Sequence, residues 1–350
     1  MTPKERQLAT IRRELTDRIS ADAIFIYNFP DIAVQLGVGI GEVWSELGID
    51  GRLMLLEYKN EFTQPPTDPN RVTWSTTLLD ENSSQYGTQR IYPLAQVKRK
   101  EDIDAYDWPD PDDFNYDLAA ENAKLWGDTY AIRGPEWVPV FCKACDLFGM
   151  EAAMIRMMTE PDIFEAALDR ITDVHVQACE RLLDTCGDAM PIFCVGDDFA
   201  TQRGLMISPS KWRQFIKPRI DRIIDVGRKR NKVIWFHSCG DVTSVLPDLI
   251  EMGVQVWETV QLQTLPYSPV DLKKKFGDRL TFFGGINTQK LPFANAEDIR
   301  AEVNGCIEVL GEGGGYICGP DHTINLDVPP QNTIDLFQAV TSFRKEGYTL

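Results

Sequence analysis

Short apolar runs alternate with longer amphipathic stretches over the C-terminal two thirds of the chain. The runs lie at 138–141, 191–196, 232–238, 254–260, 280–286 and 314–318. They are rich in Val, Ile and Phe and apolar throughout, which is typical of parallel strands covered on both faces. The stretches at 161–187, 208–230, 296–313 and 329–347 show helical spacing of apolar residues. Several open with proline, which favours the first turn of a helix.

Strand and helix units that follow one another predict an α/β protein with a parallel sheet. A chain of 350 residues suits a (β/α)₈ TIM barrel, with a doubly wound sheet as the alternative. A barrel needs two more strands upstream, for which we take 23–29 and either 52–58 or 75–80. We therefore predict one barrel domain over residues 1–350. Within it, residues 1–100 include an N-terminal helical extension or a lid over the barrel mouth.

The charge balance narrows the range of partners. The chain has 36 Lys and Arg against 53 Asp and Glu, which gives a net charge of −17. This sign argues against nucleic acid or an anionic membrane surface as a partner. No apolar stretch approaches the roughly 18 residues of a spanning helix, so we expect a cytoplasmic protein. The acidic segment 101–117 predicts a solvated loop, with a calcium site as the alternative.

The chain has eight cysteines and only three histidines. In a reducing compartment we expect most of the cysteines to be small buried apolar residues instead of disulfides. Cys142 and Cys145 form a lone CxxC motif, for which thiol redox chemistry is an alternative to burial. A zinc ribbon would need a second such pair.

His237 and Cys239 form the most informative pattern. They lie two residues apart at the end of the run 232–238, and a strand places residues i and i+2 on one face. Both side chains can therefore approach one metal ion, although a buried histidine beside a buried cysteine explains the same pattern. Cys318 ends another run. Strand ends of a barrel open on one face, so Cys318 is predicted to complete a His/Cys/Cys zinc site with an open fourth position.

Other polar residues follow the strand runs and are expected at the same face. Asp198, Glu258 and His322 are candidate catalytic residues, and Asn287 is a candidate cofactor-binding residue. Each has a simpler explanation, such as a helix cap, an exposed carboxylate or a turn. Asp198 and Glu258 can instead orient a metal-bound histidine, fill the open zinc position or act as a general base.

The segments FHSCGD, GGYICGPDHTINLDVPPQN and GDDFATQRGLMISPSKWRQFIKPRI resemble the uroporphyrinogen decarboxylase superfamily, in its cobalamin-dependent methyltransferase branch. The resemblance covers roughly residues 135–345. It implies a (β/α)₈ barrel with zinc held by an HxC motif and a distant cysteine, here His237, Cys239 and Cys318. It also implies methyl transfer between a small molecule and a corrinoid carried by a partner protein. His322 matches a histidine that the decarboxylases also have.

Two alternatives remain open at this stage. The decarboxylases resembled here act on a tetrapyrrole without metal and carry an arginine-rich signature near the first strand. The segment 23–37 has no arginine, which weakens that reading. The other alternative is a non-catalytic barrel that binds a corrinoid or a related ligand. The chain contains no DxHxxG-type run, so a corrinoid is expected on another polypeptide.

Overall fold

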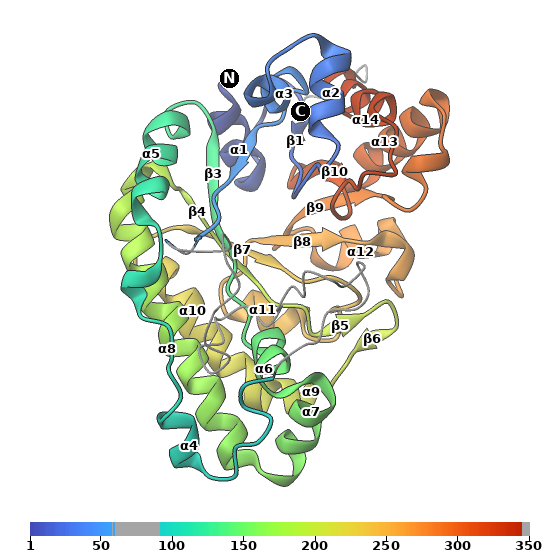
Figure 1. The fold of residues 1–350 in the computed structure, drawn as a ribbon. Coiled ribbons are helices and arrows are strands. Elements are labelled where there is room, and N and C mark those ends of the chain that lie inside the picture. The colour runs from blue at the N-terminus through green and yellow to red at the C-terminus, as the bar shows by residue number, and fades with distance from the viewer. Residues whose placement is uncertain (58, 60–91, 345–350) are drawn as a thin grey trace.

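The computed structural model describes residues 1–57, 59 and 92–344. Eight parallel strands form one sheet that curls into a nearly closed barrel, as the sequence predicts (Figure 1). The strands are β1 (Ser20–Ala21), β2 (Gly51–Leu53), β3 (Ala131–Trp137), β4 (Ile192–Gly196), β7 (Val233–His237), β8 (Val256–Val260), β9 (Thr281–Ile286) and β10 (Tyr316–Pro320). Their order around the barrel is β1-β10-β9-β8-β7-β4-β3-β2.

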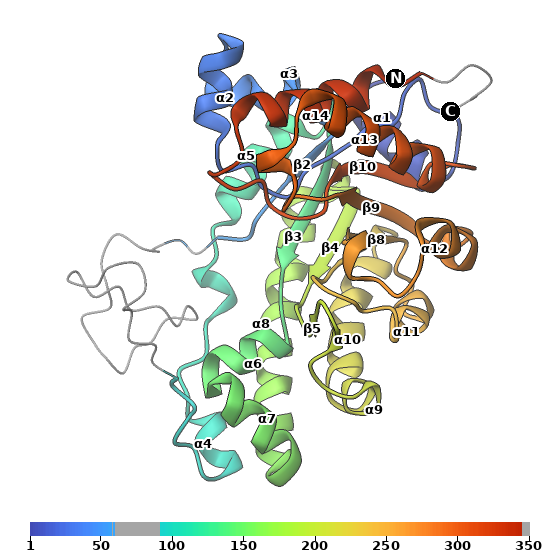
Figure 2. The ribbon, with the colours of Figure 1, turned by 90° about the vertical axis from the view of Figure 1, so that its right-hand side faces the viewer.

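Helices surround the strands on the outside (Figures 1 and 2). They are α2 (Phe29–Leu36), α3 (Val43–Glu46), α4 (Lys100–Asp104), α5 (Tyr116–Trp126), α6 (Phe141–Phe148), α7 (Met150–Thr159), α8 (Pro161–Cys186), α9 (Pro209–Lys211), α10 (Lys217–Arg228), α11 (Leu246–Glu251), α12 (Pro269–Phe276), α13 (Ala296–Leu310) and α14 (Pro330–Ser342). A small hairpin, β5 (Ala200–Thr201) and β6 (Gly204–Leu205), follows β4. Within the described part of the chain, no helix has the length and apolar character that crossing a bilayer requires.

The helix α1 (Pro3–Ile11) precedes β1 and covers one end of the barrel. Ile11 packs with the apolar side chains of the barrel interior, among them Ile192, Trp235, Phe283 and Ile317. This helix is the predicted N-terminal helical extension. The neighbouring residues on each strand point outward instead and pack against the surrounding helices, which forms the larger core between sheet and helices.

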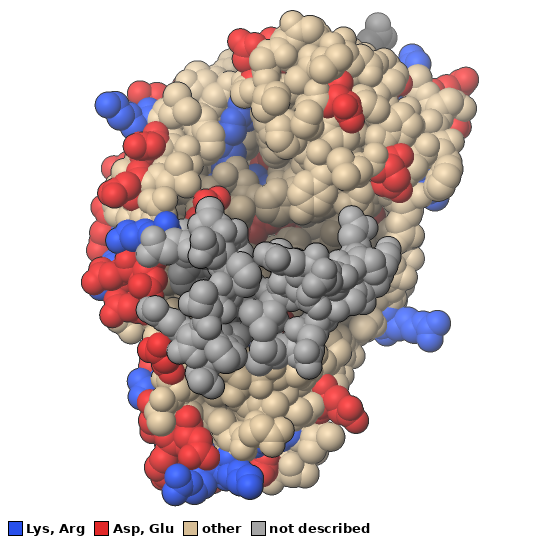
Figure 3. Space-filling view, in the orientation of Figure 1, with Lys and Arg blue, Asp and Glu red and all other residues tan. Residues whose placement is uncertain are grey.

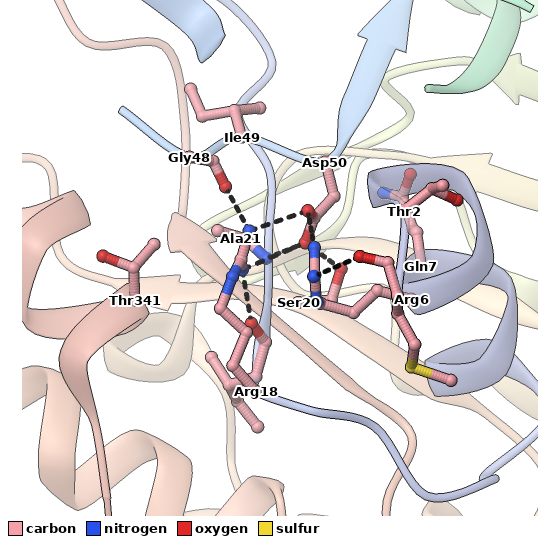
Figure 4. Close-up of polar contacts among 12 residues, drawn as sticks. Thr2, Arg6, Gln7, Arg18, Ser20, Ala21, Gly48, Ile49, Asp50 and Thr341 are labelled. Carbon is pink, nitrogen blue, oxygen red and sulfur yellow. Dashed lines mark hydrogen bonds and ion pairs between the residues drawn. The ribbon is translucent and has the colours of Figure 1, made fainter. Parts of the chain in front are cut away.

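The two edge strands, β1 and β2, meet through a buried ion cluster. The backbone N–H of Asp50 donates to the carbonyl of Ala21 over 2.8 Å. The fully buried Asp50 carboxylate accepts hydrogen bonds from Arg6 and Arg18, at 2.7 and 2.8 Å, and from the Ser20 hydroxyl at 3.1 Å (Figure 4). Burying a carboxylate requires such partners, since a lone buried charge is strongly unfavourable. The cluster therefore joins β1 to β2 in place of a regular ladder of backbone hydrogen bonds.

Three details of the sequence prediction need correction, and two others fall on residues that the structure does not describe. The third strand is β3 at 131–137, not the run 138–141. The first strand is β1 at 20–21; the run 23–29 contributes only an isolated bridge between Ile26 and Ile324. The segment 101–117 is not a simple loop, because α4 and α5 occupy parts of it. The alternative second strand at 75–80, and the proline-rich part of the predicted lid, lie outside the described residues; β2 overlaps the run 52–58.

His175 lies on α8 and is buried, with its Nε2 atom 3.0 Å from the carbonyl of Pro139. Burial lowers the pKa of this imidazole to about 3. The unfolded chain, with a histidine pKa near 6.5, binds a proton between these values that the folded chain does not. Stability is therefore lost as the pH falls through 6.5 toward 3.

We expect His175→Gln to reduce this acid sensitivity. In urea unfolding, the wild type should lose about 2 kcal/mol more than the variant between pH 7 and pH 5, because one pKa unit corresponds to about 1.4 kcal/mol. Equal losses in both proteins would show that His175 becomes protonated without unfolding and would contradict this account.

Candidate metal centre

Three neighbouring strands bring the central residues together at the carboxyl end of the barrel. His237 ends β7 and is the Cα partner of Gly196 on β4 and of Glu258 on β8. Asp198 follows β4 by two residues, and Cys239 follows β7 by two. Because parallel strands end at one face, adjacent positions in the register become neighbours in space.

Glu258 fixes the orientation of the His237 ring. The fully buried Glu258 carboxylate lies 3.0 Å from Nδ1 of His237 and accepts a second hydrogen bond from the indole N–H of Trp235. A carboxylate on Nδ1 holds the proton there and leaves Nε2 facing the mouth as a free ligand atom. This carboxylate–histidine arrangement is typical of metal sites.

Cys239 lies between two histidines. Its sulfur is 3.8 Å from Nε2 of His237 and also hydrogen-bonds with the side chain of His322. The Asp198 carboxylate accepts the backbone N–H of Cys239 at 2.7 Å and lies 3.7 Å from Nε2 of His237. One ligand atom each from Asp198, His237 and Cys239 lies within 4.8 Å of the other two.

The histidines favour the thiolate form of Cys239. Burial raises the pKa of this thiol, but hydrogen bonds from His237 and His322 outweigh burial and lower it below the usual value. The hydrogen bond with Cys239 raises the pKa of His322. Burial lowers the pKa of His237, yet Cys239 and Glu258 together raise it well above its ordinary value. The thiolate is the form in which Cys239 binds a metal, and a bound metal would displace the ligand-nitrogen protons that these raised histidine pKa values favour.

The spacing of these atoms fits zinc. Zn–N and Zn–S bonds in a tetrahedral site place neighbouring ligand atoms about 3.5 Å apart. The distances of 3.8 Å from the Cys239 sulfur and 3.7 Å from the Asp198 oxygen to Nε2 of His237 are close to this separation. A sulfur, imidazole and carboxylate set is one that zinc accepts.

Gly240 lets the chain turn directly after Cys239. Its φ is +82°, and a Cβ atom there would lie 2.5 Å from the backbone oxygen of Thr201. A side chain at this position would push the Cys239 loop away from the hairpin β5–β6. The glycine therefore keeps the sulfur in place above the strand end.

The structure does not bring Cys318 to this group of residues. On β10, Ile317 points into the barrel interior, so the alternation of the strand turns Cys318 outward into the core between sheet and helices. The thiol is fully buried and receives a hydrogen bond from the Tyr316 hydroxyl at 3.4 Å. Burial raises its pKa far above the usual range. Of the residues near the end of β10, His322 faces the centre instead.

Asn287 and Asp197 also lie at strand ends, but with local roles. The Asn287 side chain accepts the backbone N–H of Gln289 at 2.9 Å, which forms a turn after β9. The buried Asp197 carboxylate accepts three backbone N–H groups at the start of α6, including that of Phe141 at 2.7 Å. Cys142, on the same helix, is held as a neutral thiol, because burial raises its pKa strongly. Redox chemistry at the CxxC motif is therefore not favoured.

Two residues at the end of β3 belong to the site and were missed from sequence. The Trp137 ring meets the His237 ring edge-on, with 6.1 Å between centroids, and is 45% exposed. The Glu136 carboxylate lies within 4.8 Å of His237 and Glu258 ligand atoms. Burial and the neighbouring Glu258 raise the pKa of Glu136 to about 8, so it is protonated at neutral pH.

A buried arginine balances the remaining carboxylates below the site. Arg133 is fully buried inside the barrel and donates to the Asp22 carboxylate at 2.9 Å and to the Ala23 carbonyl at 2.7 Å. Its Nε atom lies 3.9 Å from Glu258 and 3.7 Å from Glu136. This guanidinium is engaged by the protein itself and does not reach the mouth as an anion receptor.

Two cavities meet at Cys239 and His322, which line both. One, of about 410 Å³, has a wall of amide and hydroxyl side chains; we call it the amide cavity. The other, of about 370 Å³, is bounded by Ile24, Phe25, Tyr27, Leu55 and Trp137, with Glu136 and Asp198 beside His237; we call it the aromatic cavity. Among the described residues that line them, neither contains a lysine or arginine. The face drawn in Figure 3 is hollowed, with mainly uncharged residues around the hollow and many acidic ones along the left edge and lower end.

A sequence model of the family described as uroporphyrinogen decarboxylase (URO-D) matches residues 140–343, more than half of the chain. The chain belongs to the uroporphyrinogen decarboxylase family. This confirms the family predicted from the strand-end motifs.

Relatives with two different activities are similar to this chain. It is 25% identical over 205 residues to a methylcobamide:CoM methyltransferase, MtaA, of Methanosarcina barkeri, which covers 59% of this chain and 55% of that protein. It is also 25% identical over 195 residues to the uroporphyrinogen decarboxylase of Aliivibrio salmonicida, covering 54% and 51%. The chain thus matches these curated relatives over about half of their length. A methyltransferase structure from Methanosarcina mazei superposes with a TM-score of 0.70 at 18% identity, covering 97% of this chain and 98% of the other, which supports the barrel fold.

Proposed function

We propose that this chain is a zinc-dependent methyltransferase that moves a methyl group between a small molecule and the corrinoid of a partner protein. The observation that carries the proposal is the Cys239 sulfur, held between His237 and His322 at the barrel mouth, with Glu258 on the far nitrogen of His237. The similarity to a methylcobamide-dependent methyltransferase supports the same reaction class.

We propose His237, Cys239 and His322 as the zinc ligands, so that His322 takes the place predicted for Cys318. Asp198 is the alternative third ligand, because one of its oxygens lies within 4.8 Å of the ligand atoms of His237 and Cys239; its contact with the backbone N–H of Cys239 also holds the loop beside the metal. Three protein ligands leave one position for a substrate heteroatom. When bound, zinc supplies a Lewis acid that lowers the pKa of a thiol or polarises a methylated heteroatom.

Other residues of the chain position and shield the proposed zinc ligands. Glu258 keeps the proton of His237 on Nδ1, and Trp235 holds Glu258 in place. Trp137 covers the edge of His237 and excludes water from it on that side. Glu136, which is protonated at neutral pH, adds no negative charge that would oppose a bound thiolate.

A decarboxylase-like lyase is the second candidate, because decarboxylases are also relatives of this chain. Such an enzyme needs cations for the carboxylates of its tetrapyrrole. Among the described residues, the two cavities have no lysine or arginine in their walls, and Arg133 is occupied by Asp22. These observations favour the methyltransferase.

Methyl transfer to and from free cobalamin tests the proposal. We expect zinc-loaded protein to demethylate methylcobalamin in the presence of a thiol, or to methylate reduced cobalamin from a methylated donor, followed by the visible absorbance of the corrinoid. Cys239→Ser should reduce the rate at least about 100-fold while the fold is retained, because the ligand thiolate is lost. Cys145→Ser, on α6 outside the site, is the matched control and should keep the rate. Decarboxylation of uroporphyrinogen without zinc would overturn the proposal in favour of the lyase.

A further inference from the structure

The two cavities differ in the chemistry of their walls, although they share Cys239 and His322. The amide cavity presents Gln202, Gln261, Gln263, Gln289 and Asn325, together with the hydroxyls of Thr201 and Thr288. The aromatic cavity presents Phe25, Tyr27 and Trp137. One wall therefore offers neutral hydrogen-bond donors and acceptors, and the other offers flat apolar faces.

Two amides of the first cavity are held in place by the protein. Gln261 accepts the N–H of Gly240 through Oε1 at 2.8 Å, which leaves its NH₂ group to donate. Gln263 donates to Asp321 through Nε2 at 2.8 Å, which leaves its carbonyl to accept. The wall thus has two oriented amides, and it also contains the carboxyl side chain of Asp327, so it favours a ligand with neutral amides over one with carboxylates.

Corrinoids and porphyrinogens differ in this respect. The rim of a corrin ring carries acetamide and propionamide groups, whereas a uroporphyrinogen carries only carboxylates. Amide groups pair with glutamine and asparagine side chains, while carboxylates need lysine or arginine to offset their desolvation. Among the described lining residues, the amide cavity meets the first requirement and not the second.

The aromatic cavity excludes anions for a different reason. The Asp198 carboxylate lies in its wall, and much of the rest is apolar. Phe25 and Tyr27 stack with 6.2 Å between their ring centroids. Such a wall favours an uncharged small molecule with an apolar or aromatic body.

We propose that the amide cavity receives the amide rim of the corrin ring and that the aromatic cavity receives the small-molecule partner, which is uncharged and aromatic or otherwise apolar. This inference rests on the proposed function and assigns its two reactants to opposite sides of Cys239 and His322. The residues shared by both cavities then lie where the methyl group passes from one reactant to the other.

Binding of two corrinoid probes tests the first half. Cobinamide carries rim amides, and cobyrinic acid is the same ring with carboxylates in their place. We expect the zinc-loaded full chain to bind cobinamide at least ten times more tightly in equilibrium dialysis. Gln202→Leu and Gln289→Leu should each weaken cobinamide binding about fivefold, as the loss of one hydrogen bond does. Gln177→Leu, exposed on α8, is the matched control and should not change it.

Equal binding of both probes, or unchanged cobinamide binding in both glutamine variants, would overturn the assignment of the amide cavity.

Phenylmethanethiol and 2-mercaptoethanesulfonate test the assignment of the aromatic cavity. The uncharged aromatic thiol should quench the fluorescence of Trp137, which is identified as the part of the tryptophan signal that Trp137→Phe lacks. The sulfonate should need at least a tenfold higher concentration for the same quenching. Tighter binding of the sulfonate would overturn this half. If the binding results contradict either half of this assignment but the wild type still transfers a methyl group from methylcobalamin, the proposed function stands.

Discussion

Replacing His322 with alanine is expected to remove zinc from the purified protein, whereas Cys318→Ala should retain about one ion per chain. His322 hydrogen-bonds with the ligand sulfur of Cys239 at the barrel mouth. The Cys318 thiol is fully buried on the outer side of β10 beside Tyr316. The loss of one of three ligands should lower zinc affinity by at least about 100-fold, since even the loss of a group that only supports a ligand costs 10–100-fold.

Elemental analysis of protein purified without chelator measures this difference. Asp198→Asn serves as the comparison, because Asp198 approaches His237 within 3.7 Å while accepting the N–H of Cys239. It should keep its zinc if the carboxylate only positions the loop. Zinc that survives His322→Ala but disappears in Cys318→Ala would restore the ligand set predicted from sequence. No zinc uptake by the wild type would contradict the proposed mechanism altogether.

Replacing Arg133 with methionine should lower the free energy of unfolding by about 3–5 kcal/mol, which is typical when one partner of a buried ion pair is removed. Asp22 would then be a fully buried carboxylate without its cation, and the fully buried Glu258 would lose the guanidinium that lies 3.9 Å away. Burial already raises the pKa of Asp22, and the loss of Arg133 would raise it further. Urea unfolding at pH 7 measures the loss.

Arg170→Met provides the matched control for this experiment. Arg170 also pairs with an aspartate, Asp104, at 2.9 Å, but both side chains are about half exposed. Exposed pairs contribute less than about 1 kcal/mol, so this variant should be nearly as stable as the wild type. Similar losses in the two variants would show that the barrel interior is better solvated than the structure indicates.

The strands that were predicted well are those with uniform apolar patterns. The runs at 191–196, 232–238, 254–260 and 280–286 contain β4, β7, β8 and β9, and the run at 314–318 overlaps β10, which ends at Pro320. Both faces of these strands are covered, so their sequences carry the signal of burial directly. Because the ends of these strands were located to within two residues, His237, Cys239, Asp198, Glu258 and His322 were all identified as neighbours of the barrel mouth.

The strand β3 was missed for a physical reason. It contains Arg133, Pro135 and Glu136, residue types that argue against a buried strand. Arg133 lies inside the barrel because it pairs with Asp22 and lies near Glu258 on β8, contacts between distant segments that no local pattern records. With the strand placed too late, Glu136 and Trp137 did not appear as strand-end residues.

Two other differences between the sequence prediction and the structure concern the run 23–29 and Cys318. The apolar run 23–29 was taken as a strand, but Phe25 and Tyr27 are part of the aromatic cavity. Cys318 was placed at the mouth because it ends a strand run, yet the face on which a residue lies depends on register. Ile317 points inward in the observed register, so the thiol of its neighbour points outward.

The pairing of β1 with β10 has a consequence for how the chain folds. Ser20 pairs with Ile317, so the first and last strands of the barrel come from positions roughly 300 residues apart. Closure therefore depends on contacts of very high sequence separation, which form slowly because a long loop must be closed first. During synthesis, β1 has no partner from β10 until nearly the whole chain has emerged. The Arg6, Arg18 and Asp50 cluster gives β1 a partner nearer in sequence, which can hold it beside β2 until the last strand arrives.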